Sequence, residues 1–199
     1  MIRLYILYKR CINKISYIIY QKQAIFQLKK AKAKFSNDIM FAGPCTLNIQ
    51  GKCTIGEGFI CRSSINNCID FGFSKIVIRP NAELCIGNYS GISNVLLHCY
   101  NNITIGNYVN IGAGTMIFDT NFHSTNWQDR ENRLIDIQNA KTAPIYIGDY
   151  VFIGARCIIG KGVTIGDKSI IAAGSVVTRD IPSGEIWGGN PVKFIKKNN

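Results

Sequence analysis

The feature that most limits the fold of this chain is a six-residue repeat. Residues 145–178 read IYIGDYVFIGARCIIGKGVTIGDKSIIAAGSVVT, and an aliphatic residue returns at every sixth position. These positions are Ile147, Ile153, Ile159, Ile165, Ile171 and Val177. Gly or Ala follows the first five of them. A period of six fits neither a helix nor a simple alternating strand. It therefore predicts short extended segments separated by turns.

Three such segments make a triangular coil of 18 residues, so Ile147 is expected to stack beneath Ile165 (165 − 147 = 18). Strands of successive coils would then pair about 4.8 Å apart. Glycine after the aliphatic residue suits a tight corner that leaves no room for a side chain. Because one coil cannot bury its own core, several must stack for stability. We therefore expect an all-β solenoid.

The repeat extends towards the N-terminus. The same phase appears at Ile105, Ile111 and Ile117, and more weakly at Ile86, Ile92 and Ile55. The pattern blurs between residues 57 and 83, where Cys61 and Phe73 are expected to point inward and the register stays open.

The repeat [LIV]-[GA]-x-x-[STV]-x, with eight Ile-Gly pairs, resembles that of the hexapeptide-repeat acyltransferases, in their sugar O-acetyltransferase branch. The resemblance covers residues 84–195 well and 45–83 loosely. It implies a left-handed parallel β-helix over residues 37–195. It also implies a homotrimer, with acetyl-CoA lying between neighbouring prisms.

The regular pattern breaks after Ile117. The next clean coil places Ile147 after Ile105, and 147 − 105 = 42, which is one coil plus 24 residues. We therefore expect a long excursion loop at about 118–146, and long loops on rigid scaffolds are usually functional. Its segment Asp119–His123 resembles the D-x-x-x-H segment of the family. The resemblance makes His123 the general base that deprotonates the acceptor hydroxyl, without an acyl-enzyme. Either Asp119 or a backbone carbonyl would orient its ring.

The other histidine, His98, lies among apolar residues and is interpreted as structural or acceptor-lining. A γ-class carbonic anhydrase shares the fold but needs three histidines for zinc, and this chain has two. No metal is expected. The eight cysteines form no C-x-x-C pair, which favours free, buried thiols in a reducing cytosol.

The resemblance also assigns residues to the donor and the acceptor. Ala155 would donate its N–H to the thioester oxyanion. The other candidates for acetyl-CoA are Phe152, Ala173, Gly174, Thr178, Arg179 and Lys193. Candidates for the acceptor are Asn94, Asn121, Trp127 and Arg130. Corner geometry alone explains Gly154 and Gly166 but does not explain the run from Thr178 to Pro182.

Residues 1–36 predict a basic helix with an apolar stripe at Leu4, Tyr8, Cys11, Ile15, Ile18 and Ile19. Residues 1–34 carry nine basic residues and no acidic one, so a net charge of +11 leaves 11 − 9 = +2 for the rest. This distribution argues against a nucleic-acid-binding body. The helix either packs on the body or a partner subunit, or lies on an anionic membrane. Neither a signal peptide nor a transmembrane helix is expected.

These observations predict an acetyl-CoA-dependent O-acetyltransferase for a surface-glycan sugar, in the cytoplasm or at the inner face of the plasma membrane. The alternatives are an N-acetyltransferase of a nucleotide-linked amino sugar, a serine-type O-acetyltransferase, and a non-enzymatic β-helical assembly module.

Overall fold

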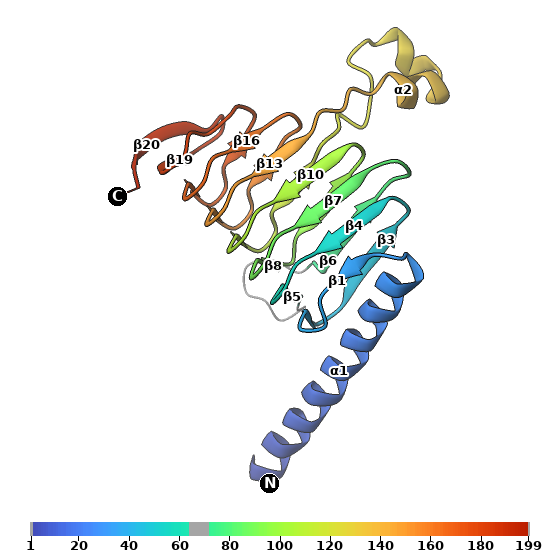
Figure 1. The fold of residues 1–199 in the computed structure, drawn as a ribbon, viewed down its shortest axis with the longest axis vertical. Coiled ribbons are helices and arrows are strands. Elements are labelled where there is room, and N and C mark those ends of the chain that lie inside the picture. The colour runs from blue at the N-terminus through green and yellow to red at the C-terminus, as the bar shows by residue number, and fades with distance from the viewer. Residues whose placement is uncertain (1, 64–71, 199) are drawn as a thin grey trace.

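The computed structural model describes residues 2–63 and 72–198, and its strands stack into a three-sided prism (Figure 1). Sheet A contains β1 (Lys34–Phe35), β4 (Lys52–Ile55), β7 (Glu83–Ile86), β10 (Asn102–Ile105), β13 (Ile145–Ile147) and β16 (Thr164–Ile165). Sheet C contains β3 (Cys45–Ile49), β6 (Ser74–Ile78), β9 (Leu96–Cys99), β12 (Met116–Phe118), β15 (Ile158–Ile159) and β18 (Val176–Val177).

Sheet B contains β2 (Met40–Ala42), β5 (Ile60–Arg62), β8 (Gly91–Ser93), β11 (Asn110–Ile111), β14 (Phe152–Ile153), β17 (Ile170–Ile171), β19 (Glu185–Gly188) and β20 (Lys193–Lys197). The strands pair in parallel except for β19 and β20, which form an antiparallel pair at the C-terminal end. Consecutive strands of a coil therefore fall in different sheets, which defines a parallel β-helix.

The register confirms the predicted stacking. Ile147 lies opposite Ile165, and Ile105 lies opposite Ile147 across the inserted loop. All three side chains are buried in one continuous core. In the blurred region Cys61 points inward as predicted, but Phe73 does not, because its side chain is 48% exposed. Ser74, the first residue of β6, takes the buried position instead.

Corner geometry accounts for the glycines that follow the core isoleucines. A Cβ on Gly154 would lie 2.5 Å from the nitrogen of Ala173 in the next coil. A Cβ on Gly166 would lie 2.5 Å from the nitrogen of Ser183. The prediction that corner geometry explains these two glycines is therefore confirmed.

The helix α1 (Ile2–Lys30) covers the N-terminal end of the prism with its last turns only (Figure 1). Ala24 and Leu28 are buried in the core. The Gln21 side chain donates to the Ile39 carbonyl at 2.8 Å and accepts from the Phe41 N–H at 2.6 Å, which pairs the open edge of β2. The earlier turns project away from the body. Within the described part of the chain, no helix is both long and apolar enough to cross a bilayer.

Six cysteines have free thiols, and four of them are buried: the six are Cys45, Cys53, Cys61, Cys85, Cys99 and Cys157. Burial raises the pKa of the Cys53 and Cys99 thiols to about 12. These thiols therefore act as small apolar side chains of the core.

Candidate functional site

The excursion loop leaves the prism after β12 and returns before β13, so it projects from the edge between sheets C and A (Figure 1). Two backbone hydrogen bonds close its base: Ala143 N–H donates to the Asp119 carbonyl, and Asn121 N–H donates to the Lys141 carbonyl, each at 3.0 Å. Beyond this base lie a 3₁₀ turn (Gln128–Glu131) and α2 (Arg133–Asn139). The predicted interruption of the prism is thus a folded loop.

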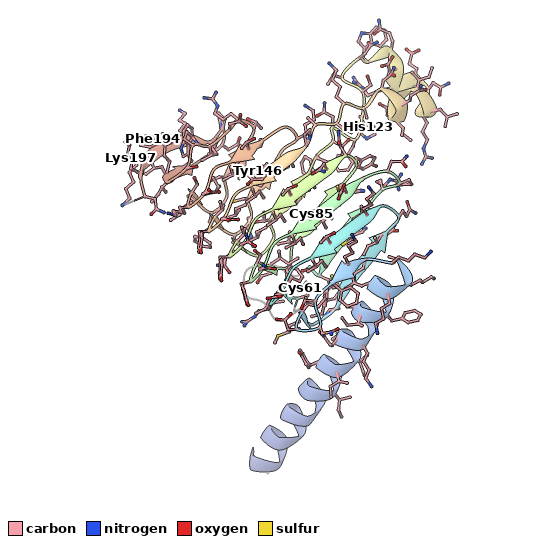
Figure 2. The ribbon with its side chains drawn as sticks, in the orientation of Figure 1. Cys61, Cys85, His123, Tyr146, Phe194 and Lys197 are labelled. Atoms are coloured by element: carbon pink, nitrogen blue, oxygen red, sulfur yellow. The ribbon has the colours of Figure 1, made fainter. Side chains whose placement is uncertain are left out.

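The loop, on which Figure 2 labels His123, brings this residue against Asp136. Asn132 caps the start of α2 by accepting from the N–H groups of the second and third residues that follow it. One turn later, Asp136 places Oδ2 2.6 Å from Nδ1 of His123, while Oδ1 accepts from Ser124 N–H at 2.7 Å. Hydrogen bonds from His123 and from Ser124 N–H lower the pKa of the Asp136 carboxyl. Asp136 is therefore an ionised acceptor near neutral pH.

This contact leaves the other ring nitrogen of His123 available. An ionised carboxylate accepts the hydrogen on Nδ1, so the neutral ring carries its free lone pair on Nε2. The His123 side chain is 70% exposed, whereas that of Asp136 is 9% exposed. The pair therefore presents a basic nitrogen to the outside, which is the geometry of a general base.

The expectation that Asp119 orients His123 is wrong. The Asp119 carboxylate is buried and accepts from the N–H groups of Tyr100 and Asn101, each at 2.7 Å. It closes the corner of the previous coil. The partner of the ring instead comes from a helix 13 residues further along the chain, which a D-x-x-x-H spacing does not reveal.

An aromatic cluster anchors the loop beside His123. Phe122 has a left-handed backbone (φ 62°), and its ring lies 5.2 Å from His98, 5.4 Å from Phe118 and 5.9 Å from Tyr100. Burial lowers the pKa of His98, whose ring also packs against Tyr100. The structural interpretation of His98 fits this position. Phe122 was missed from the sequence, although it directly precedes the histidine.

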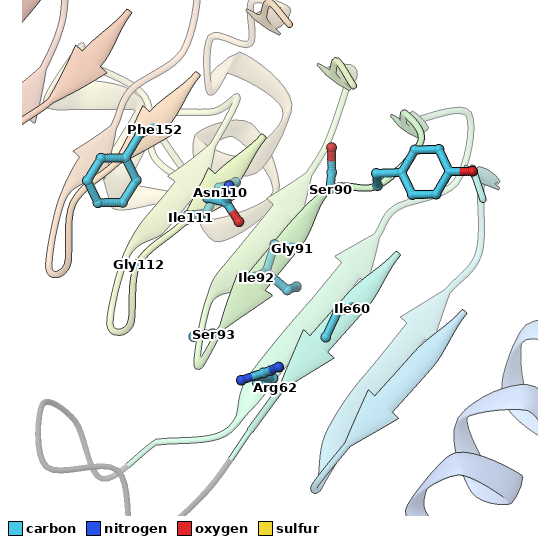
Figure 3. A pocket seen from close by; sticks show the side chains of 11 residues that line it. Ile60, Arg62, Ser90, Gly91, Ile92, Ser93, Asn110, Ile111, Gly112 and Phe152 are labelled. Carbon is cyan, nitrogen blue, oxygen red and sulfur yellow. The ribbon is translucent and has the colours of Figure 1, made fainter. Parts of the chain in front are cut away.

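A groove of about 430 Å³ runs over the outer face of sheet B (Figure 3). Its lining residues are Ile60, Arg62, Tyr89, Ser90, Gly91, Ile92, Ser93, Asn110, Ile111, Gly112 and Phe152. Phe152 lines the groove with a side chain that is 48% exposed. No described residue of the excursion loop lines it. His123 and the groove therefore occupy different sides of one prism.

Three of the residues assigned to the donor lie just beyond this groove. Ala155, Ala173 and Gly174 occupy the corner between sheets B and C in two successive coils. Gly174 has φ +73°, and a Cβ built on it would meet nothing within 4 Å. The left-handed backbone requires the glycine, and the open space beside it is compatible with a ligand.

The other donor candidates, Thr178, Arg179 and Lys193, are exposed. Two other residues of the run from Thr178 to Pro182 have structural contacts. Asp180 accepts from Thr164 N–H at 2.7 Å, and Ile181 is buried.

Two of the acceptor candidates have structural contacts. Asn94 is buried and has a left-handed backbone (φ 44°), so it forms a corner between sheets B and C. The Arg130 guanidinium donates to the Ser124 carbonyl at 2.7 Å, so it braces the loop. Asn121 lies at the base of the loop, while Trp127 is 61% exposed on it.

Comparisons with known proteins agree with this architecture. A family model described as "Hexapeptide repeat of succinyl-transferase" matches residues 144–179. Galactoside O-acetyltransferase of Escherichia coli is 38% identical over 97 residues, which is 49% of this chain and 45% of that protein. A 2,3,4,5-tetrahydropyridine-2,6-dicarboxylate N-acetyltransferase of Staphylococcus aureus is 34% identical over 94 residues, 47% of this chain and 33% of that protein. The chain thus spans less than half the length of these relatives.

Two solved structures share the fold. A variant of AntD, an N-acyltransferase from Bacillus cereus solved with dTDP and coenzyme A, has a TM-score of 0.70 at 23% identity, covering 87% of this chain and 88% of that one. The hexapeptide-repeat acetyltransferase VCA0836 from Vibrio cholerae, solved with acetyl coenzyme A, has a TM-score of 0.60 at 23% identity, covering 89% and 77%.

The stacked coils and these neighbours define the class as the left-handed parallel β-helix, as predicted. Within that class, the match of residues 144–179 to the hexapeptide-repeat model and the partial similarity to the galactoside enzyme agree with the predicted resemblance to the hexapeptide-repeat acyltransferases.

Proposed function

We propose that this protein is an acetyl-CoA-dependent O-acetyltransferase that acts on a sugar hydroxyl of a surface glycan or its precursor. The observation that carries the proposal is the His123 ring, fixed at Nδ1 by Asp136 and open at Nε2. Nε2 would take the hydroxyl proton as the sugar oxygen attacks the thioester carbonyl. The C–S bond then breaks, the thiolate receives that proton from His123, and the products are an acetyl ester and a free thiol.

The donor side of the proposal uses residues around the upper end of the groove. The Ala155 N–H would stabilise the oxyanion that forms on the thioester carbonyl. Phe152, Ala173 and Gly174 would line the pantetheine arm. Arg179 and Lys193 would bind the phosphates of acetyl-CoA through charge-assisted hydrogen bonds, with Thr178 beside them.

The separation of His123 from the groove supports a site built by two copies of the chain. His123 projects from the edge between sheets C and A, whereas Phe152 lies on sheet B. A neighbouring prism would place its loop over the groove of the next, and in a closed ring of three copies every groove would be completed. We therefore include the homotrimer in the proposal.

The direct test is His123→Ala, assayed by thiol release from acetyl-CoA with a panel of sugars. Loss of a positioned base lowers kcat by about 10²–10⁴. Gln138→Ala, an exposed change in the same loop, is the matched control and keeps normal turnover. Melting temperature and oligomeric state should match wild type for both variants. Full turnover by His123→Ala would remove this residue from the role of base.

The same panel separates an oxygen acceptor from a nitrogen acceptor. The S. aureus relative and AntD carry the names of enzymes that acylate nitrogen, so amino sugars, nucleotide-linked amino sugars and serine belong in the panel. Acetylation of amines alone would replace the O-acetyltransferase proposal with an N-acetyltransferase. Absence of thiol release with every acceptor would favour the assembly module.

The exposed side of α1 supports contact with an anionic membrane. At about 100° per residue, Ile15, Ile19 and Phe26 fall within about 40° of one another. All three are exposed, and they lie opposite the side on which Ala24 and Leu28 are buried. The nine basic residues of 1–34 add attraction to acidic lipid.

Vesicle sedimentation tests this part of the proposal. The protein should sediment with vesicles that contain phosphatidylserine, less so at high salt, and not with phosphatidylcholine alone. Replacing Ile15, Ile19 and Phe26 with serine should release it, while Ile137→Ser on the exposed side of α2 should not. A loss of self-association in place of lipid binding would instead assign this stripe to contacts between copies.

A further inference from the structure

Gly91 interrupts a column of outward-facing side chains on sheet B. In register across four neighbouring strands, Ile60, Gly91, Asn110 and Phe152 lie opposite one another. Gly91 alone in this column has no side chain, and it lies in the groove between Ile60 and Asn110 (Figure 3). The depth of the groove at this point therefore comes from a missing side chain.

Neither backbone conformation nor packing requires a glycine here. Gly91 is outside the left-handed region, and a Cβ on it would meet only the Asn110 Oδ1 and the Ile60 carbonyl oxygen, both at 3.6 Å. That is ordinary contact. The adjacent Gly112 differs, because its Cβ would lie 2.6 Å from the nitrogen of Ala155.

Gly91 is the first residue of β8, and a glycine in a strand commonly marks a bulge or the close approach of a ligand or another backbone. The register of β8 with β5 and β11 has no bulge. No described residue fills the space over Gly91, which leaves that space open to a ligand.

The lining of the groove suits a sugar that carries a negative charge. Tyr89 and Phe152 offer exposed aromatic rings, and Asn110 and Ser93 offer hydrogen-bonding groups. Arg62 is exposed, and its guanidinium makes no hydrogen bond or ion pair with any other described residue. Its guanidinium matches a phosphate or a carboxylate. A volume of about 430 Å³ is in the range of small-molecule sites.

The groove meets the donor residues at Phe152 and extends away from the others. Ala155, Ala173 and Gly174 lie beyond β14 towards the C-terminus, whereas the groove runs from β14 in the opposite direction to Arg62 on β5. We infer that Gly91 forms the floor of an acceptor subsite for an anionic sugar, with Arg62 as the partner of the negative group. This inference rests on the proposed function.

The test combines Gly91→Leu with kinetics for three acceptors: a hexose phosphate, a hexuronic acid and a neutral hexoside. Gly91→Leu should raise the KM of the anionic acceptor at least tenfold and leave the KM of acetyl-CoA unchanged. Its melting temperature should not fall, because the glycine serves no structural need. Gly160→Ala, at a glycine outside the groove where a Cβ would also make an ordinary contact at 3.4 Å, is the control and should leave both KM values unchanged.

Arg62→Gln should raise the KM of the anionic acceptor tenfold or more and leave that of the neutral hexoside within twofold. The hexose phosphate and the hexuronic acid are compared by their rise in KM. The acceptor with the larger rise carries the group that Arg62 binds. An equal rise in KM for charged and neutral acceptors would overturn the role of Arg62.

Other results would assign the groove differently. A raised KM for acetyl-CoA with an unchanged acceptor KM would assign it to the donor. Dissociation of the oligomer by Gly91→Leu would assign it to a second copy of the chain. If wild type acetylates none of the sugars, the proposed function fails, and calorimetric titration with hexose phosphate still tests the subsite. If wild type binds hexose phosphate and Gly91→Leu does not, the subsite is upheld. If wild type does not bind hexose phosphate, the subsite is rejected.

Discussion

The prism and the excursion loop are held together by different forces. In the prism, side chains such as Ile105, Ile147 and Ile165 are fully buried and repeat from coil to coil. In the loop, the carboxylates of Asp129 and Asp136 collect hydrogen bonds from surrounding side chains and N–H groups. The prism is thus stabilised by burial of apolar area, and the loop by a small charged network. A substitution can therefore weaken the prism without weakening the loop, or weaken the loop without weakening the prism.

The largest expected effect comes from a cavity in the prism. Ile147→Ala should lower the free energy of unfolding by about 2–5 kcal/mol, because the buried side chain leaves a void between two coils. Ile137→Ala, on the exposed side of α2, should change it by at most about 0.5 kcal/mol. Urea titrations followed by circular dichroism measure both. An equal loss for Ile137→Ala would contradict the exposed position of that side chain.

Removal of the charge on Asp136 should affect activity more than stability. Asp136→Asn no longer stabilises the imidazolium that forms in the transition state, so kcat should fall by at least about tenfold. Asp149→Asn is the matched control in the prism, since Asn107 makes the same corner hydrogen bond to the previous coil. Thiol release measures both variants. A normal kcat for Asp136→Asn would show that His123 needs no carboxylate.

The smallest expected effect is that, as pH falls, the loop loosens at a higher pH than the one at which the prism unfolds. The folded-state pKa values of Asp129 and Asp136 are lowered, mainly by hydrogen bonds from Ser124 and His123 respectively. A lowered pKa means that these contacts stabilise the loop above the unfolded carboxyl value of about 3.9 and are lost as pH falls through the folded values. The loop should therefore loosen below about pH 4, before the prism unfolds.

Trp127 reports on this transition, because it lies on the loop. In a Trp187→Phe background its fluorescence should change at a higher pH than the far-ultraviolet dichroism of the prism. With Asp129→Asn and Asp136→Asn combined, the separate fluorescence step should disappear. Coincident transitions in the starting protein would contradict the independence of the loop.

The errors made from the sequence have a common cause. The His123 position and the interruption of the prism were predicted, because both follow from counting along a periodic chain. Asp136 was missed, and Asp119 was assigned its role, because the ring partner depends on how the loop folds back on itself. Asn94 and Arg130 stay predictions for the acceptor, and the sequence did not reveal that Asn94 forms a corner or that Arg130 braces the loop.

The sequence by itself determined the coil length, the register of the core from residue 84 onward and the place where the prism is interrupted. It did so because a six-residue repeat requires each aliphatic residue to lie beneath its successor, which is a local rule. Only the tertiary structure decided which carboxylate contacts His123, how the end of α1 covers the open edge of β2, and that Gly91 leaves a gap in an otherwise filled column. These depend on contacts between residues distant in sequence, whose energies no local pattern records.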